Sequence, residues 1–352
     1  MSRYIRPEIL SMSGYVAGEQ PASDSDVIKL NTNENPYRAS EKSYNAIRRV
    51  LEFGLSRYPD PRAAEFCEIV GRKYGIDPAT ILCGNGSDDI LTILTRTFVG
   101  SGELLRLPYP TYILYRSLAE IQGAGSELIH FNEDWSLPDN FYSAGENLRL
   151  VFLPNPNSPS GTVIPKERIV EIADNLPCPL VIDEAYIDFA DDSCIDLAGR
   201  HKRIIVTRTF SKSHSLAGLR FGYLVAAVEL VEQMLKVKDS YNCDTISIAA
   251  AAAAISDESW QVENRKKIIA TRNRLTEKMR AMGFNVPDSK ANFTWNTRTD
   301  INVRLIYEYL KSQGVLVRYM NYPDWGDGLR ISVGTDEQVD KCLELIRQFV
   351  EK

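Results

Sequence analysis

The sequence has little of what marks several common classes of protein. It holds only three histidines and six cysteines in 352 residues, and no two cysteines form a Cys-x-x-Cys pair. A zinc ribbon and a disulfide framework are therefore not expected, and a reduced, cytoplasmic setting is the default. His130, His201 and His214 have no metal-ligand spacing, so we predict no metal site.

Long apolar runs and an excess of positive charge are also missing. The N-terminus lacks the apolar core of a secretory signal, and the most apolar stretch, 246–255, is too short and too rich in alanine to span a bilayer. The formal net charge of −6 argues against nucleic acid or an anionic membrane as the main partner. Small anionic substrates are still compatible with it, because local arginines can override a weak overall field.

Short β-rich runs alternate with helical stretches between about residues 76 and 225. Continuous runs of Val, Ile and Leu are typical of strands buried on both faces of a parallel sheet. The expected strands are 81–83, 103–107, 128–131, 148–153, 180–182, 204–207 and 223–226. Beyond about residue 227, shorter elements and a long amphipathic helix over 258–282 predict a smaller α+β lobe.

Polar and aromatic clusters follow five of the expected strands. Ligands of a parallel α/β sheet bind at the carboxyl ends of its strands, so these clusters should meet at one edge. They are 84–88 (Gly-Asn-Gly-Ser-Asp), 109–112 (Tyr-Pro-Thr-Tyr), 155–161, 183–186 (Asp-Glu-Ala-Tyr) and 209–212 (Thr-Phe-Ser-Lys). We expect a ligand site at that edge.

Simpler interpretations of the single motifs stay open at this point. The glycine-rich turn at 84–89 opens a helix, where free N–H groups and the helix dipole favour an anion. It reads Gly-x-Gly-x-x-Asp, so a nicotinamide-binding oxidoreductase is a poor interpretation. Ser87 or Asp88 could be an ordinary helix cap, and so could Asp183. Lys212 could be solvated, or it could be a buried nucleophile.

One chemistry uses all of these parts together. Pyridoxal 5'-phosphate needs a lysine for a Schiff base, a carboxylate for its pyridine nitrogen, a donor to its ring oxygen, a stacking ring and a phosphate cradle. The residues that fill these roles in turn are Lys212, Asp183, Tyr186, Tyr112, and Gly86, Ser87, Asp88, Ser211 and Arg220 for the phosphate. The sequence therefore predicts pyridoxal 5'-phosphate as the cofactor.

The chain resembles the fold-type I, class I and II aminotransferases, and among them the histidinol-phosphate aminotransferase family. The segments that carry the resemblance run in family order over nearly the whole chain: 6–18, 30–36, 57–60, 84–88, 109–112, 155–161, 183–186, 211–222, 317–318 and 329–334. The resemblance implies an α/β fold with a mostly parallel seven-stranded sheet in a large domain, 37–245. It also implies a smaller α+β domain with an N-terminal arm, formed by 1–36 and 246–352.

The resemblance also implies a role for each site residue. Lys212 carries the aldimine with the cofactor and then moves a proton, Asp183 pairs with the pyridine nitrogen, and Tyr186 bonds to the ring oxygen. The other implied cofactor contacts are Gly86, Ser87, Asp88, Tyr112, Asn157, Thr209, Ser211, Arg220, and Tyr58 from the neighbouring subunit of a homodimer. The implied substrate contacts are Tyr15, Asn33, Arg318 for a phosphate and Arg330 for a carboxylate.

One segment departs from the family pattern. Residues 157–161 read Asn-Ser-Pro-Ser-Gly, where the family usually has Asn-Asn-Pro-Thr-Gly. A serine therefore stands where the second asparagine contacts the cofactor oxygen, and we assign that contact to Asn157.

The reaction implied by the resemblance is a ping-pong transfer of an amino group in histidine biosynthesis. Glutamate and imidazole acetol phosphate would yield 2-oxoglutarate and histidinol phosphate. Aromatic amino-acid aminotransferases and threonine-phosphate decarboxylase share most of the motifs and remain alternatives. A transcription regulator with an aminotransferase-like domain is disfavoured, because the match begins near residue 3 and the chain is acidic.

Overall fold

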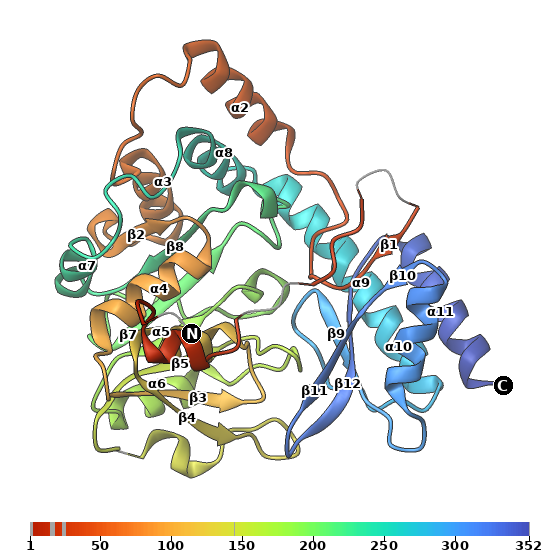
Figure 1. Cartoon of the computed structure of the whole chain (residues 1–352). Helices are drawn as coiled ribbons and strands as arrows, with labels where there is room; N and C mark the ends of the chain where they lie inside the picture. The colour runs from red at the N-terminus through yellow and green to blue at the C-terminus, as the bar shows by residue number, and fades with distance from the viewer. Residues whose placement is uncertain (1–2, 15–17, 23–25, 144, 352) are drawn as a thin grey trace.

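A computed structural model describes residues 3–14, 18–22, 26–143 and 145–351. The chain folds into two lobes, a larger one around a seven-stranded sheet and a smaller one around a three-stranded sheet (Figure 1). The strands of the larger sheet are β2 (Ile81–Gly84), β3 (Leu104–Tyr109), β4 (Gly125–His130), β5 (Leu148–Pro154), β6 (Leu180–Asp183), β7 (Ile204–Thr209) and β8 (Gly222–Val225). Every strand expected from the sequence is present within a few residues of its predicted bounds.

The strand order of the larger sheet is β2-β8-β7-β6-β5-β3-β4. The neighbouring pairs from β7 across to β4 are all parallel, whereas β8 runs antiparallel to both β7 and β2. Because β8 alone is reversed, the carboxyl ends of the other strands lie at one edge of the sheet. The expectation of a mostly parallel seven-stranded sheet is confirmed.

Helices cover both faces of this sheet, because its strands are apolar on both sides. In β5, Val151 and Leu153 belong to one buried cluster, while Leu150 and Phe152 belong to another. The first cluster includes α3 (Ala64–Tyr74), α6 (Lys166–Asn175) and α8 (Thr245–Ile255). The second includes α4 (Ser87–Phe98), α5 (Leu114–Gln122) and α7 (Val228–Met234). The larger lobe is therefore a three-layer α/β/α sandwich.

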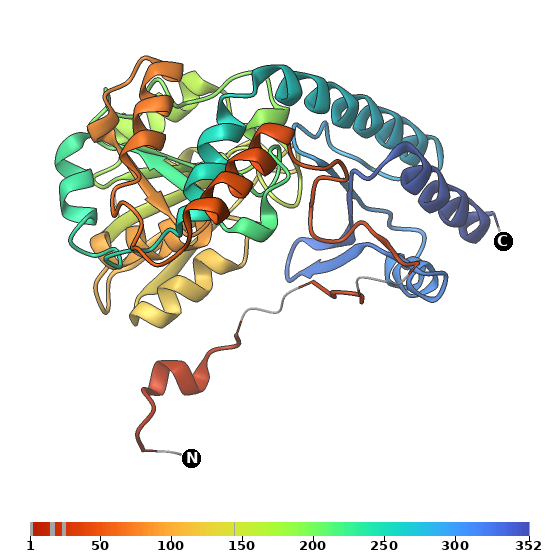
Figure 2. The ribbon, with the colours of Figure 1, turned by 90° about the horizontal axis from the view of Figure 1, so that it is seen from above.

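The smaller lobe packs helices against one face of an antiparallel sheet. Its strands have the order β11-β12-β9, with bounds Arg318–Tyr322, Gly326–Ser332 and Phe293–Asn296. The helices are α9 (Glu258–Ala281), α10 (Val303–Ser312) and α11 (Asp336–Val350), and apolar residues of all three share a buried cluster with the sheet. Both views show α9 running from beside the larger lobe into the smaller one (Figure 2).

The N-terminal part of the chain joins the C-terminal lobe. Strand β1 (Ile28–Lys29) pairs in parallel with β10 (Val315–Leu316). Helix α2 (Glu41–Phe53) packs on α8, which spans the proposed domain boundary between residues 245 and 246. The boundaries 37–245 and 1–36 plus 246–352 stay a prediction.

The residues at the beginning of the described chain contact the larger lobe. Helix α1 (Pro7–Ser11) contacts α5, and the Arg6 guanidinium donates to the Ile121 carbonyl oxygen at 2.9 Å. No helix in the described part of the chain combines the length and apolar character needed to cross a membrane.

Candidate active site

A cavity of about 300 Å³ opens at the shared carboxyl edge of the larger sheet, between the two lobes. Its lining includes twelve of the predicted site residues: Asn33, Ser87, Asp88, Tyr112, Asp183, Tyr186, Thr209, Ser211, Lys212, Arg220, Arg318 and Arg330. A larger hollow of about 970 Å³, lined by Trp135, Arg298 and Trp325 among others, holds none of the predicted site residues. The smaller cavity, where the strand ends meet, is therefore the candidate active site.

Lys212 follows β7 and is half-buried at the cavity wall. Its Nζ donates to the Thr32 carbonyl oxygen at 3.1 Å, and the Asn35 amide donates to the Lys212 carbonyl oxygen at 3.1 Å. Burial, together with the nearby Arg330 cation, lowers the pKa of Lys212 to about 8. An amine with this pKa is partly neutral near pH 7, as a nucleophile for a carbonyl must be.

Asp183 is the last residue of β6 and is buried at the cavity floor. Its Oδ1 accepts from the Ala185 backbone N–H at 3.1 Å, and its Oδ2 accepts from the Tyr115 hydroxyl at 2.7 Å. Burial raises the pKa of Asp183, and the Tyr115 hydrogen bond opposes that shift. Two donors on a buried carboxylate hold it in one orientation.

Tyr186 and Asn33 form one hydrogen-bonded unit. The Asn33 side-chain amide donates to the Tyr186 hydroxyl at 2.9 Å, and its Oδ1 accepts from the Ser332 hydroxyl at 2.9 Å. Asn33 has a left-handed backbone with φ 56, a conformation that asparagine tolerates better than most residues. Burial raises the pKa of Tyr186, so its phenol keeps a proton to donate. Asn33, predicted as a substrate contact, thus lies against Tyr186.

A cradle for an anion forms at the N-terminus of α4. Gly86 is the residue before the helix and has φ +80, and a Cβ there would lie 2.6 Å from Nη2 of Arg220. Arg220 donates to the Ser211 hydroxyl at 3.3 Å and to the Asp88 carboxylate at 3.1 Å. The Thr209 hydroxyl donates to Ser211 at 3.0 Å. Free N–H groups at the helix start, hydroxyls and a guanidinium together suit a phosphate.

Two arginines enter the cavity from the smaller lobe. Arg318 of β11 and Arg330 of β12 are register partners in the antiparallel pair. Arg330 donates to the Ser158 hydroxyl and to the Asn31 carbonyl oxygen, each at 3.0 Å. Its Nε has no hydrogen-bond partner among the described residues. A guanidinium bonded only to neutral groups suits an incoming carboxylate or phosphate.

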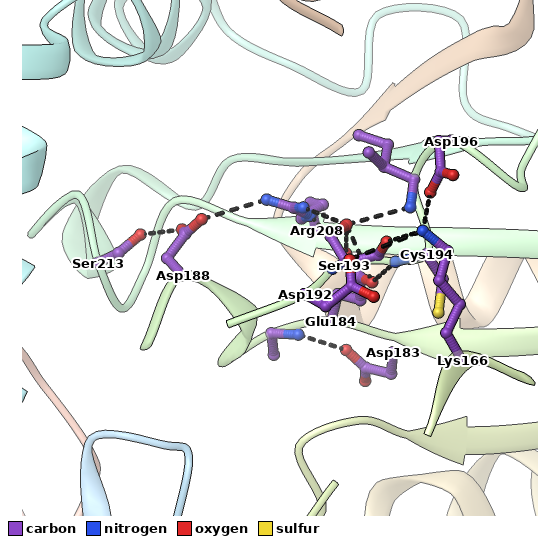
Figure 3. Close-up of polar contacts among 12 residues, drawn as sticks. Lys166, Asp183, Glu184, Asp188, Asp192, Ser193, Cys194, Asp196, Arg208 and Ser213 are labelled. Carbon is purple, nitrogen blue, oxygen red and sulfur yellow. Dashed lines mark hydrogen bonds and ion pairs between the residues drawn. The ribbon is translucent and has the colours of Figure 1, made fainter. Parts of the chain in front are cut away.

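A buried ion network is formed by Arg208, Glu184 and Asp188 (Figure 3). Nε of Arg208 donates to Glu184 at 2.8 Å, and Nη1 of Arg208 donates to Asp188 at 3.2 Å. Asp188 also accepts a short hydrogen bond from the Ser213 hydroxyl. Glu184 follows Asp183, and Ser213 follows Lys212. The network therefore fixes the backbone next to Asp183 and next to Lys212.

Three predicted residues, Gly86, Asn157 and Tyr58, are not part of the cavity lining, and a fourth, Tyr15, is outside the described residues. The amide of Asn157 donates to the Pro110 carbonyl oxygen and the Ser160 hydroxyl, at 3.3 and 3.0 Å. Asn157 is not part of the cavity lining, whereas Ser158 is. Gly86 lies under the cradle, and Tyr58 lines a separate hollow.

The sequence interpretation missed Tyr115 as a residue of the cavity. Tyr115 contacts Asp183, and the spacing Tyr112-x-x-Tyr115 at the start of a helix is a signal for two neighbouring side chains. The described residues contain no group of three or more His, Cys, Asp and Glu that could hold a metal ion.

Known proteins resemble this chain over its whole length. A family model described as aminotransferase class I and II matches residues 25–346. A histidinol-phosphate aminotransferase of Rhodopirellula baltica is 51% identical over 347 residues, which cover 98% of this chain and 96% of the relative. A histidinol-phosphate aminotransferase 1 of Trichormus variabilis is 41% identical over 350 residues, which cover 99% of this chain and 100% of the relative. The solved histidinol-phosphate aminotransferase of Sinorhizobium meliloti, in complex with pyridoxal 5'-phosphate, has a TM-score of 0.89 at 26% identity and covers 99% of both chains.

Proposed function

Because the chain belongs to the class I and II aminotransferase family, we propose that it acts as a pyridoxal 5'-phosphate-dependent histidinol-phosphate aminotransferase. It transfers the amino group of L-glutamate to imidazole acetol phosphate, in histidine biosynthesis. The observation that carries this choice is the pair Arg318 and Arg330, which line the same cavity as Lys212 and provide two cations for the carboxylates of glutamate and the phosphate of the imidazole substrate. Arginine binds carboxylates and phosphates through paired N–H donors.

The residues of the cavity fit this cofactor. The cradle of Arg220, Ser211 and the α4 N-terminus suits its phosphate, and the buried Asp183 carboxylate suits a protonated pyridine nitrogen. When bound, pyridoxal phosphate supplies an electron sink that stabilises negative charge at the substrate Cα. Gly86 leaves room for the Arg220 guanidinium, which a Cβ would displace. The fit supports the proposal that these residues hold the cofactor.

The side chains around the cofactor then divide the work. The neutral amine of Lys212 would attach the cofactor and, once a substrate amine has replaced it there, would move a proton between the substrate Cα and the C4′ carbon of the cofactor. Asp183 keeps the pyridine nitrogen protonated, and Tyr186 donates to the ring oxygen. Arg330 holds the carboxylate of glutamate, and Arg318 helps to hold the phosphate of the imidazole substrate.

The protein is proposed to act as a homodimer, with Tyr58 of one subunit at the neighbouring cofactor. Apolar side chains project at the end of α2 and beyond it: Leu51, Phe53 and Leu55 are exposed, Phe53 to 90%. Tyr58 is 81% exposed and stacks on Tyr241 at 4.4 Å between ring centroids. Exposed apolar surface of this kind is typical of an interface between proteins.

Mixing two inactive variants tests the shared site. Tyr58→Ala and Lys212→Ala dimers should each be weak or inactive, because each site lacks one of the two side chains. In a mixed dimer, one site regains both Lys212 and a neighbouring Tyr58, so roughly a quarter of wild-type activity should return if subunits mix at random. No recovery after proven subunit exchange would place Tyr58 in its own subunit's site or outside any site.

The reaction is tested with a panel of substrates on the purified protein. Histidinol phosphate should bleach the visible band of the bound cofactor, and 2-oxoglutarate should restore it, as a ping-pong exchange requires. Phenylalanine and threonine phosphate are the decisive alternatives. A response to phenylalanine alone would indicate an aromatic aminotransferase, and release of carbon dioxide from threonine phosphate would indicate the decarboxylase.

A cytoplasmic location is also proposed. All six cysteines of the chain are buried and free, although the sulfur atoms of Cys67 and Cys83 are only 3.9 Å apart. Unpaired neighbouring thiols are usual in a reducing compartment.

A further inference from the structure

Tyr115 connects two groups that the proposed chemistry needs. It lies in α5, is only 1% exposed, and its hydroxyl donates to Oδ2 of Asp183 at 2.7 Å. Its ring meets the Tyr112 ring edge to face, with centroids 5.5 Å apart and an interplanar angle of 87°. Phe152 of β5 packs on the same ring at 4.9 Å. One buried side chain therefore contacts both the acid at the cavity floor and the aromatic ring at its wall.

We propose that Tyr115 is a positioning residue of the amino transfer: it orients the Asp183 carboxylate toward the pyridine nitrogen and supports the Tyr112 ring. The inference rests on the proposed function for the identity of the cofactor. It assigns to Tyr115 a role that is exerted through Asp183 and Tyr112.

The geometry of the carboxylate supports this role. A carboxylate has about four lone-pair positions, and a hydrogen bond on each oxygen prevents it from turning. The Ala185 N–H occupies Oδ1 and the Tyr115 hydroxyl occupies Oδ2, from opposite ends of the same group. What remains of the acceptor capacity of Asp183 faces the cavity that its side chain lines. The acid is thus pre-oriented before any ligand arrives.

The chemistry of the donor also matters. Burial, with Asp183 adding to it, raises the pKa of Tyr115 well above its ordinary value, so the proton stays on the phenol. A neutral donor stabilises the carboxylate without cancelling its charge. Without that donor, Asp183 becomes more basic and competes for the proton of the pyridine nitrogen. The electron sink then weakens, because it depends on that proton.

The test compares three variants of the holoenzyme. Tyr115→Phe removes only the hydroxyl, Tyr115→Leu also removes the ring beside Tyr112, and Tyr223→Phe is a control at a tyrosine buried outside the cavity lining. Tyr115→Phe should lower kcat about 10- to 100-fold, the effect of losing a hydrogen bond to a charged group, with little change in KM. Tyr115→Leu should in addition weaken cofactor binding by the apoprotein. Tyr223→Phe should match wild type in both measurements.

The decisive measurement needs no substrate. In protein loaded with pyridoxal phosphate labelled with ¹⁵N, the resonance of the ring nitrogen should shift toward the unprotonated value in Tyr115→Phe and stay unchanged in Tyr223→Phe. An unchanged resonance overturns the proposal, even if kcat falls, because a loss of stability alone would not move it. A wild-type protein that binds no pyridoxal phosphate would instead refute the proposed function itself.

Discussion

Arg318 and Arg330 lie directly opposite each other across the β11–β12 pair, and both line the cavity that holds Lys212. Like charges at directly opposed positions of a sheet repel each other. Within the described ranges, the Arg330 guanidinium donates to two neutral acceptors, the Ser158 hydroxyl and the Asn31 carbonyl oxygen. An anionic group that binds between the two side chains therefore gains two charge contacts and relieves a repulsion, which suits either a carboxylate or a phosphate.

The first prediction concerns the carboxylate of the amino donor. Arg330→Ala should raise KM for 2-oxoglutarate about 10- to 100-fold, because a charged hydrogen bond is lost. Initial rates at varied 2-oxoglutarate concentration measure it. Arg304→Ala is the control, since Arg304 is exposed on α10 and pairs with Glu308. Equal KM values in the wild type and Arg330→Ala would show that Arg330 does not bind the carboxylate of 2-oxoglutarate.

The second prediction concerns the close approach of two backbone segments under the phosphate cradle. A Cβ at Gly222 would lie 2.8 Å from the Arg208 carbonyl oxygen and 2.9 Å from the Ser87 backbone nitrogen. Gly222→Ala should therefore displace the start of α4 and weaken cofactor retention about tenfold or more. Equilibrium dialysis against pyridoxal phosphate measures the loss.

Gly218 provides the matched control for that substitution. It lies four residues earlier in the same segment, and a Cβ there would meet no atom within 4 Å. Gly218→Ala should bind the cofactor as wild type does. If both variants lose the cofactor equally, the segment is sensitive to any substitution and the backbone contact is not the cause.

The third prediction follows from the pKa of Lys212, which burial lowers to about 8. Below about pH 8 the amine of Lys212 is mostly protonated, and a protonated amine is not nucleophilic. The rate of cofactor attachment to the apoprotein should therefore rise with pH up to about 8 and then level off. Stopped-flow absorbance across pH measures the profile. Glu34 raises the pKa of Lys212, so Glu34→Gln should move the profile to lower pH. A rate that keeps rising toward the ordinary lysine pKa would contradict the shift.

The fourth prediction concerns the ion network of Figure 3. Arg208→Met would leave the fully buried Glu184 carboxylate without its cation, since the side chain of Glu184 has 0% exposure. Loss of one partner of a buried pair should lower the free energy of unfolding by roughly 3–5 kcal/mol. Urea unfolding measures it, with Arg304→Ala as the exposed comparison, expected to cost less than about 1 kcal/mol. Similar losses of unfolding free energy in the two variants would mean that the buried ion pair stabilises the fold no more than an exposed one.

Much of the larger lobe was predictable because its strands are buried on both faces. Continuous apolar runs such as 148–153 and 204–207 are stable mainly as strands covered on both faces. The polar clusters that follow such strands meet at the edge where parallel strands end. Helix α8 was not predicted, because nine of its eleven residues are apolar and show no period from which a helical face can be read. Helix α2 was not predicted either, although its apolar residues have a helical spacing; the structure shows that it packs chiefly on α8.

The order of motifs determined the chemistry, and the tertiary structure decided which side chains take part in it. A lysine after one buried strand and an acid after another already indicate the cofactor. Sequence position does not tell which side of a loop faces a cavity, and so Ser158 lines it while Asn157 bonds to its own loop. Asn33 likewise turns to Tyr186, and Tyr115 reaches Asp183 across 68 residues of chain. Such contacts depend on how the helix and loops pack on the sheet, a long-range arrangement that no local pattern encodes.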